Sequence, residues 1–212
     1  DELLGVLNKQ KGKIIVTSGP TYEEIDDVKV VTNKSSGKQG RALAIELSAR
    51  GYEIVYIHSS SIDHIPGLDN VSFHSSNDLK NKILENINNT EAIFMTAAVS
   101  DFTVKKTSGK ISRSNGNITL ELIPNEDIIA VIKSSYPEIK CIAFSAQVDD
   151  ELNFNKIKTK NVDYLVINNI LKNKFGSDTN KVSIIDQQHL LFESEELDKN
   201  EISRDILNAL EY

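Results

Sequence analysis

Several features are absent from this sequence of 212 residues, and each absence excludes a class of protein. Cys141 is its one cysteine, so an intrachain disulfide cannot form. No apolar run approaches the roughly 18–20 residues that a membrane span needs. The first residues also lack the basic start and apolar stretch of a signal peptide. Together these absences predict a protein of the reducing cytoplasm with no membrane partner.

Positive charge is scarce as well. The net charge is −7, which argues against a nucleic-acid partner because such proteins need a basic face. An anionic small ligand remains compatible with this charge, since salt screens a distant acidic surface over about 8–10 Å. The four histidines are scattered, and no Cys/His cluster has metal-ligand spacing. The ligands of any metal are therefore unknown from the sequence.

The pattern of apolar residues favours one globular domain. Short β-rich apolar runs alternate with helical patterns, which is the signature of βαβ units. We therefore expect an α/β fold with a Rossmann-like, doubly wound, mostly parallel sheet. The expected strands are 13–18, 52–58, 71–75, 92–99, 141–146 and 164–168, followed by a closing hairpin at 182–185 and 190–193. The expected helices are 37–50, 78–88, 125–134, 149–160 and 194–210.

An antiparallel insertion is expected within this parallel pattern. Asn115-Gly116 is the strongest two-residue hairpin signal, because both positions accept positive φ. Flanking strands at 110–113 and 117–122 would make an inserted antiparallel hairpin arm covering about residues 103–123. Residues 1–12 are expected to be a leader or a linker remnant, which the missing initial Met agrees with. Residues 13–212 are expected to form a single nucleotide-binding domain.

The segment from Asn33 to Gly40 (NKSSGKQG) has the composition of a phosphate loop. Ser35 or Ser36 can cap the helix that follows, and glycines such as Gly37 permit close approach of a ligand. The helix N-terminus offers free N–H donors, and Lys38 adds a full charge. The segment matches neither GxxxxGK[ST] nor GxGxxG. By local physics alone, an ordinary capped helix explains it equally well.

Other polar or open positions also follow predicted strands, where a doubly wound sheet binds its ligands. Each has an ordinary structural explanation beside the functional one: a turn, a solvated charge, or a core aromatic ring. Lys156 and Lys160, for example, share one helix face that solvent alone would explain. The candidates are Gly19, Ala97, Asp101, Lys110, Phe144, Lys156 and Lys160.

In their order and spacing, these segments resemble one family, the phosphopantothenoylcysteine synthetases. The resemblance runs from about Lys13 to the C-terminus. The matching pieces are TSGPTYEEID (17–26), VTNKSSGKQG (31–40), AAVSDF (97–102), Lys110-Ile111, PNEDI (124–128), AFSAQ (143–147), KIKTKNVDYLVIN (156–168) and FGSDTNKVSII (175–185). Each piece alone is weak, but eight in order make a chance match very improbable.

The resemblance implies a ligase that joins 4′-phosphopantothenate and L-cysteine in coenzyme A biosynthesis. The bacterial type uses CTP and Mg²⁺, forms an acyl-cytidylate with release of pyrophosphate, and then forms the amide with release of CMP. Alternatives are the same reaction with ATP, an NAD(P) oxidoreductase on the same fold, and a nucleotide-binding module without catalysis. The missing GxGxxG argues against the oxidoreductase.

The resemblance also implies roles for individual residues. Asn33 matches the amide that converts the acyl-cytidylate, and Lys110 matches the lysine that helps to form it. The positions that match nucleotide contacts are Asp101, Pro124, Asn125, Glu126, Phe144, Lys156 and Lys160. Lys29 stands where many members have an arginine, and Gln147 stands in the FAAET-like motif.

Two partners follow from the same resemblance. The arm resembles the one through which family members dimerise, so a homodimer is expected. Many bacteria fuse such a synthetase behind a flavin-dependent phosphopantothenoylcysteine decarboxylase, and residues 1–12 resemble the end of the connecting linker. A fused or associated decarboxylase is therefore the expected protein partner.

Overall fold

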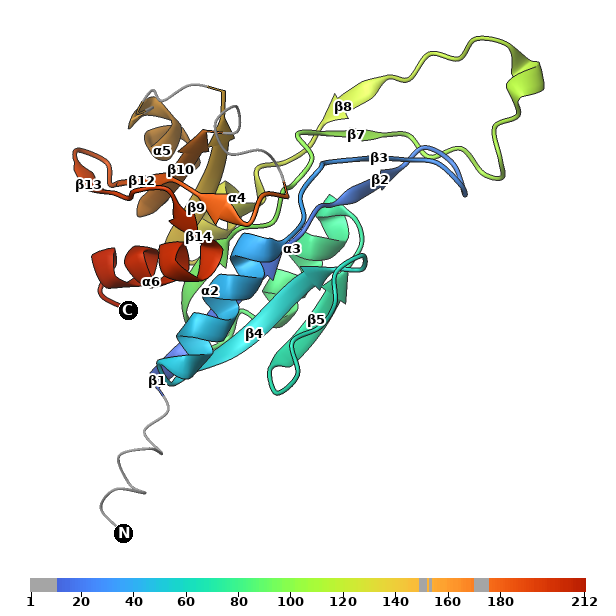
Figure 1. The fold of residues 1–212 in the computed structure, drawn as a ribbon. Helices are drawn as coiled ribbons and strands as arrows, with labels where there is room; N and C mark the ends of the chain where they lie inside the picture. The colour runs from blue at the N-terminus through green and yellow to red at the C-terminus, as the bar shows by residue number, and fades with distance from the viewer. Residues whose placement is uncertain (1–10, 149–151, 153, 170–175) are drawn as a thin grey trace.

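The sheet is organised around strand β1 (Lys11–Ser18), whose central residues are apolar and fully buried on both faces. The computed structural model describes residues 11–148, 152, 154–169 and 176–212 (Figure 1). Within them an eight-stranded sheet has the order β13-β12-β10-β9-β6-β1-β4-β5. Its other strands are β4 (Tyr52–Ser59), β5 (Asp69–Phe73), β6 (Thr90–Met95), β9 (Lys140–Gln147), β10 (Tyr164–Asn169), β12 (Val182–Ile185) and β13 (Leu190–Glu193).

The direction of winding reverses between β1 and β6. The chain passes from β1 to β4 and β5 on one side, then returns to β6, β9 and β10 on the other, and all these pairs are parallel. Strands β12 and β13 close the sheet in antiparallel fashion. This is the doubly wound order whose ligand crevice lies at the reversal point. The predicted fold class is confirmed.

Helices cover both faces of the sheet and bury a separate apolar cluster on each. Because successive strand residues point to opposite faces, Ile15 packs with one cluster while Ile14 and Val16 pack with the other. The Ile15 face is covered by α3 (Ser76–Glu85), α4 (Ile128–Ser135) and α5 (Phe154–Lys160). The opposite face is covered by α2 (Lys38–Ala49) and α6 (Lys199–Ala209).

Short antiparallel pairs lie outside the main sheet. They are β2 (Tyr22–Glu24) with β3 (Val30–Thr32), β7 (Phe102–Val104) with β8 (Leu122–Pro124), and β11 (Thr179–Asn180) with β14 (Leu197–Asp198). The segment between β7 and β8 extends away from the body, and the β2–β3 hairpin runs beside it (Figure 1). An antiparallel arm is therefore present where the sequence predicted one.

The internal structure of the arm differs from the prediction. Asn115 ends a 3-10 turn, η1 (Arg113–Asn115), and the strands pair instead at the base of the arm, where Val104 is opposite Leu122. Asn115-Gly116 is thus not a tight hairpin turn. A local preference for a turn has no effect on pairing when the partner strands lie far from it in the sequence.

Several predicted bounds also shift. Helix α3 begins at Ser76 because Ser75 accepts the N–H of Asp78, and strand β6 ends at Met95. The C-terminal helix begins after Asp198, whose carboxylate accepts the N–H groups of Asn200 and Glu201. The predicted helix 149–160 is seen from Phe154, since most of residues 149–153 lie outside the described residues, as do residues 1–10 of the predicted leader.

Candidate active site

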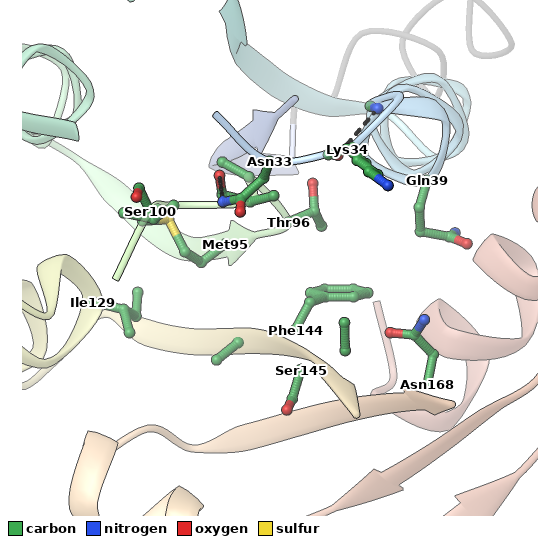
Figure 2. A pocket seen from close by; sticks show the side chains of 18 of the residues that line it. Asn33, Lys34, Gln39, Met95, Thr96, Ser100, Ile129, Phe144, Ser145 and Asn168 are labelled. Atoms are coloured by element: carbon green, nitrogen blue, oxygen red, sulfur yellow. Dashed lines mark hydrogen bonds between the residues drawn. The ribbon is translucent and has the colours of Figure 1, made fainter. Parts of the chain in front are cut away.

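A pocket of about 780 Å³ lies at the point where the sheet reverses. Its wall contains the residues that follow β3 and β6, the start of α2 and α4, and the ends of β9 and β10. Figure 2 shows Asn33 and Thr96 on one side, Ser145 and Asn168 on the other, and the ring of Phe144 between them. A pocket of this size suits a nucleotide-sized ligand.

The loop before α2 is held against the end of β1. Ser18, which is fully buried, donates its Oγ–H to the carbonyl of Gly37 at 2.8 Å. Gly37 has φ of 68°, a left-handed conformation that favours glycine, and occupies the N-cap position of α2. The predicted capping by Ser35 or Ser36 is wrong. Ser35 Oγ instead accepts the N–H of Gly37 at 3.4 Å, and α2 has no side-chain cap.

The uncapped start of α2 lines the pocket. Gly37, Lys38, Gln39 and Gly40 all belong to its wall. A Cβ at Gly40 would lie 2.8 Å from the Cβ of Ser18 and would also collide with Thr96 Oγ1, so only glycine allows this approach of helix to strand. The free N–H groups and the dipole of the helix make an anion site without any special side chain.

Asn33 lies on the pocket wall directly after β3. Its Nδ2 donates to the carbonyl of Ala98 at 2.9 Å, which fixes the orientation of the amide (Figure 2). The Oδ1 atom accepts no hydrogen bond from the described residues. Asn33 therefore presents one acceptor to the pocket in a fixed place.

The pocket wall also contains most of the predicted nucleotide contacts. Ala97, Asp101, Asn125, Glu126, Phe144, Lys156 and Lys160 all line the pocket. Lys156 donates from Nζ to Ser145 Oγ at 2.8 Å, and burial followed by the nearby charge of Lys160 lowers its pKa. Lys160 pairs with Asp127 at 2.6 Å, and Glu126 pairs with Lys80 at 2.8 Å.

Lys38 is part of the wall, but its charge already has a partner. Its Nζ lies 2.6 Å from Asp178 Oδ1 and 3.0 Å from the carbonyl of Gly176. Both groups are exposed, with 46% and 87% of the two side chains accessible. Contact of Lys38 with a phosphate remains a prediction.

Three predicted site residues do not line the pocket: Gly19, Lys110 and Pro124. Gly19 lies behind the loop before α2, and its carbonyl accepts the N–H of Ala98 at 2.9 Å. Pro124 ends β8 at the base of the arm, and Lys110 is an exposed residue of the arm itself.

The helix expected to start at Asn125 begins instead at Ile128. Asp127 caps α4 by accepting the N–H of Ala130 at 3.4 Å. The side chain of Asn125 donates to the carbonyl of Ser100 at 2.9 Å, and its backbone N–H donates to Asp101 at the same distance. Asn125 therefore ties the return of the arm to the loop that follows β6.

The chain is similar to proteins of a known family. The family model for the DNA/pantothenate metabolism flavoprotein C-terminal domain matches residues 9–212. The chain belongs to this family. The family relationship predicted from the sequence motifs is thereby confirmed.

Individual relatives of this C-terminal domain are similar over nearly the whole chain. It is 33% identical over 211 residues to a cysteine/cysteine sulfinic acid decarboxylase from an unknown prokaryotic organism, covering 93% of this chain and 57% of that protein. It is 32% identical over 204 residues to the coenzyme A biosynthesis bifunctional protein CoaBC of Bacillus subtilis (strain 168), covering 93% of this chain and 50% of that one. The chain thus spans about half the length of these curated relatives.

A solved structure has the same fold over the same extent. It is the C-terminal domain of a coenzyme A biosynthesis bifunctional protein CoaBC, with 28% identity and a TM-score of 0.75. The match covers 95% of this chain and 96% of that domain. The mostly parallel sheet with its helices is therefore shared with a flavoprotein C-terminal domain of known structure.

Sequence reasoning missed several pocket residues of this family member. Thr96, Ser145, Asn168 and Gln39 line the pocket, and the first three stand at strand ends, a signal that was available from the sequence. Gln39 bonds Ser203 Oγ at 2.9 Å, a contact between distant segments that no local pattern predicts.

Neither a metal-binding cluster nor a membrane-spanning helix occurs among the described residues of this domain. They contain no group of three or more His, Cys, Asp or Glu side chains placed to hold a metal ion. Among the same residues, no helix combines the length and the apolar character needed to cross a membrane.

Proposed function

We propose that this domain catalyses ligation of 4′-phosphopantothenate and L-cysteine in coenzyme A biosynthesis, using CTP. The observation that carries the proposal is the pocket at the sheet reversal. It brings the oriented amide of Asn33 and the uncapped start of α2 into one cavity with Lys156 and Lys160. Relatives named for coenzyme A biosynthesis and the motifs of the synthetase family support the same reaction.

The first half-reaction transfers the cytidylyl group of CTP to a carboxylate. A carboxylate oxygen of phosphopantothenate attacks the α-phosphorus of CTP, the bond to pyrophosphate breaks, and an acyl-cytidylate forms. Charge accumulates on the phosphates, which the N–H groups of α2 and the ammonium groups of Lys156 and Lys160 are placed to stabilise. Mg²⁺ would supply charge neutralisation as part of the nucleotide complex, a mode that needs only one or two protein carboxylates, and Asp101 is a candidate.

The second half-reaction is amide formation. The amine of cysteine attacks the acyl carbon and loses a proton, and CMP leaves with the electrons of the broken acyl–oxygen bond. Asn33 is proposed to act here, because its amide is fixed on the wall by the 2.9 Å bond to Ala98. Its free carbonyl oxygen can accept a hydrogen bond from the attacking amine and aim that amine at the acyl carbon without needing to reorganise during the reaction.

Lys110 is proposed to act in the first half-reaction from outside the pocket wall. It is exposed on the arm and lies outside the pocket wall, so it would reach the nucleotide as a fixed part of the arm, either when the arm moves as a unit or when the arm of a second copy docks at this pocket. A homodimer formed through the arm fits its apolar surface, because Ile118, Leu120, Leu122 and Ile123 are each 40–50% exposed.

A decarboxylase partner is also proposed. The support is the name of the curated relatives, bifunctional proteins about twice as long as this chain. Co-purification of a flavin-containing protein or segment with the native protein from its source cell would test it. A native protein without either would contradict this part of the proposal.

The deciding experiment measures pyrophosphate release with phosphopantothenate present, comparing CTP with ATP, each with and without cysteine. We expect release with CTP before cysteine is added, and CMP formation only after. Faster release with ATP would replace CTP in the proposal, and no release with either would refute the ligase.

A pair of variants in the same assay tests the role of Lys110. Lys110→Ala should suppress pyrophosphate release, whereas Lys105→Ala, an equally exposed lysine of the same arm, should not. Equal rates for both variants would remove Lys110 from the mechanism.

A further inference from the structure

The turn of the β2–β3 hairpin grips the backbone on both sides of Lys110. Asp26 in this turn is 1% exposed, an unusual burial for a carboxylate. Its Oδ2 accepts the N–H of Ile111 at 2.9 Å, and the Nζ of Lys29 donates to the carbonyl of Ile111 at 3.1 Å. Both backbone groups of the residue after Lys110 are therefore bound.

The residue before Lys110 is bound in the same way. Asp27 Oδ2 accepts the N–H of Gly109 at 2.8 Å, and the N–H of Asp27 donates to the carbonyl of Gly109 at 3.1 Å. Lys106 lies 3.0 Å from the other oxygen of Asp27. The peptide on each side of Lys110 is thus fixed, while its own side chain is exposed and has no hydrogen-bond partner among the described residues.

The carboxylate of Asp26 has no acceptor site left for a further hydrogen bond. Besides Ile111, it accepts the N–H groups of Val28 at 2.8 Å and Lys29 at 2.7 Å, and the ammonium of Lys29 at 2.6 Å. Four donors saturate the acceptor sites of one carboxylate. We call Asp26, Asp27 and Lys29 together the clamp. The ammonium of Lys29 and then these backbone donors hold the pKa of Asp26 far below its usual range, so its carboxylate is charged near neutral pH.

The hairpin also connects this clamp to the pocket. Strand β3 ends at Thr32, whose Oγ1 donates to the carbonyl of Thr21 at 2.8 Å, and the next residue is Asn33. One end of the hairpin therefore places Asn33, while its turn binds the backbone on both sides of Lys110. The two residues assigned to successive half-reactions are therefore positioned by one small hairpin.

We infer that Asp26, together with Lys29 and Asp27, is a positioning residue that fixes the backbone of Lys110 for the first half-reaction. This inference rests on the proposed function for the role of Lys110, but not for the clamp itself. Lys29 belongs to this arrangement through its side chain. A single ammonium here bonds both Asp26 and the carbonyl of Ile111.

The test compares Asp26→Asn with Asp186→Asn as a matched control. Asp186 makes the same local turn contacts, accepting the N–H groups of Gln188 at 2.7 Å and His189 at 2.6 Å, but has no contact with the arm. Because a misplacement of about 1 Å can reduce a rate ~100-fold, we expect a loss of that order in kcat of pyrophosphate release for Asp26→Asn. The control should keep the parent rate.

Two further readouts separate positioning from general stability. In a Lys110→Ala background, Asp26→Asn should cause no further loss, because it acts through Lys110. Trypsin should cut after Lys110 faster in Asp26→Asn than in the parent or the control, with fragments identified by mass. If Asp26→Asn fails to fold, Asp27→Asn gives the same test from the other side.

The outcomes are distinct. A parent rate for Asp26→Asn, an additive loss in the Lys110→Ala background, or unchanged cleavage after Lys110 would each overturn the inference. If the parent protein releases no pyrophosphate with either nucleotide, the proposed function fails. The cleavage pattern still tests the clamp in that case.

Discussion

Replacing Gly37 by alanine tests whether the phosphate loop depends on its fit against the end of β1. An alanine at its φ of 68° is strained by about 1–2 kcal/mol, and reduced freedom of the unfolded chain offsets about 0.4–1 kcal/mol of that. The new Cβ would also lie 2.9 Å from Ser18 Oγ and collide with the end of Ile62. Crowding of this kind costs about 1–3 kcal/mol.

Gly67 provides the matched control. Its φ is 86°, and a Cβ there would meet nothing within 4 Å, so Gly67→Ala carries the backbone strain without the crowding. We expect a loss in the free energy of unfolding of about 1 kcal/mol for Gly67→Ala and about 2–4 kcal/mol for Gly37→Ala. Denaturant titration of both variants measures the difference.

Activity gives a second measure of the same substitution. The Gly37 carbonyl is held by Ser18, so a displaced Cα moves the N–H groups at the start of α2. The KM for the nucleotide should rise in Gly37→Ala and stay unchanged in Gly67→Ala. Equal stability loss in the two variants, together with equal KM values, would refute the close fit of loop and strand.

Three other predictions concern separate parts of the chain. Asn33→Asp should keep pyrophosphate release but accumulate acyl-cytidylate, detected by mass spectrometry after a quench; normal turnover would remove Asn33 from the second half-reaction. Burial raises the pKa of the Cys141 thiol to about 12, so a thiol reagent at pH 8 should react only after unfolding, and rapid labelling of the native protein would contradict this. Ile118→Asp with Leu120→Asp should shift a dimer toward monomer in sedimentation, while an unchanged mass would exclude the arm as the interface.

The parallel sheet was predictable because its strands are nearly continuous apolar runs. Strands that are buried on both faces must have this composition, so the apolar runs of β1 and β6 could be recognised as buried strands from the sequence. The β2–β3 hairpin had no such signal. Glu23 within β2 is buried, yet its carboxylate is satisfied by the N–H of Ser76 at 3.0 Å and by Thr103 Oγ1 at 3.1 Å. Those partners lie far away in the sequence.

The candidate site also has features that the sequence predicted and features that it did not. The resemblance named residues on both pocket walls because motifs preserve residue types at strand ends. Which residue caps a helix was not predictable, since Ser35, Ser36 and Gly37 all suit an N-cap and only the contact of Gly37 with Ser18 selects among them. The position of Lys110 outside the pocket wall was not predictable either, because the sequence did not predict the β2–β3 hairpin that binds the residues on both sides of it.

The charge of the pocket differs from that of the whole chain. Its wall contains five lysines and three carboxylates, although the net charge of the protein is −7. Among the described residues, Lys38 pairs with Asp178 and Lys160 pairs with Asp127, at sites that are partly open to solvent. Exposed pairs contribute about 0–1 kcal/mol each, whereas a hydrogen bond to a charged group contributes about 1.5–3 kcal/mol. A triphosphate would therefore displace both carboxylates at little cost, so these acidic partners do not prevent an anion from binding.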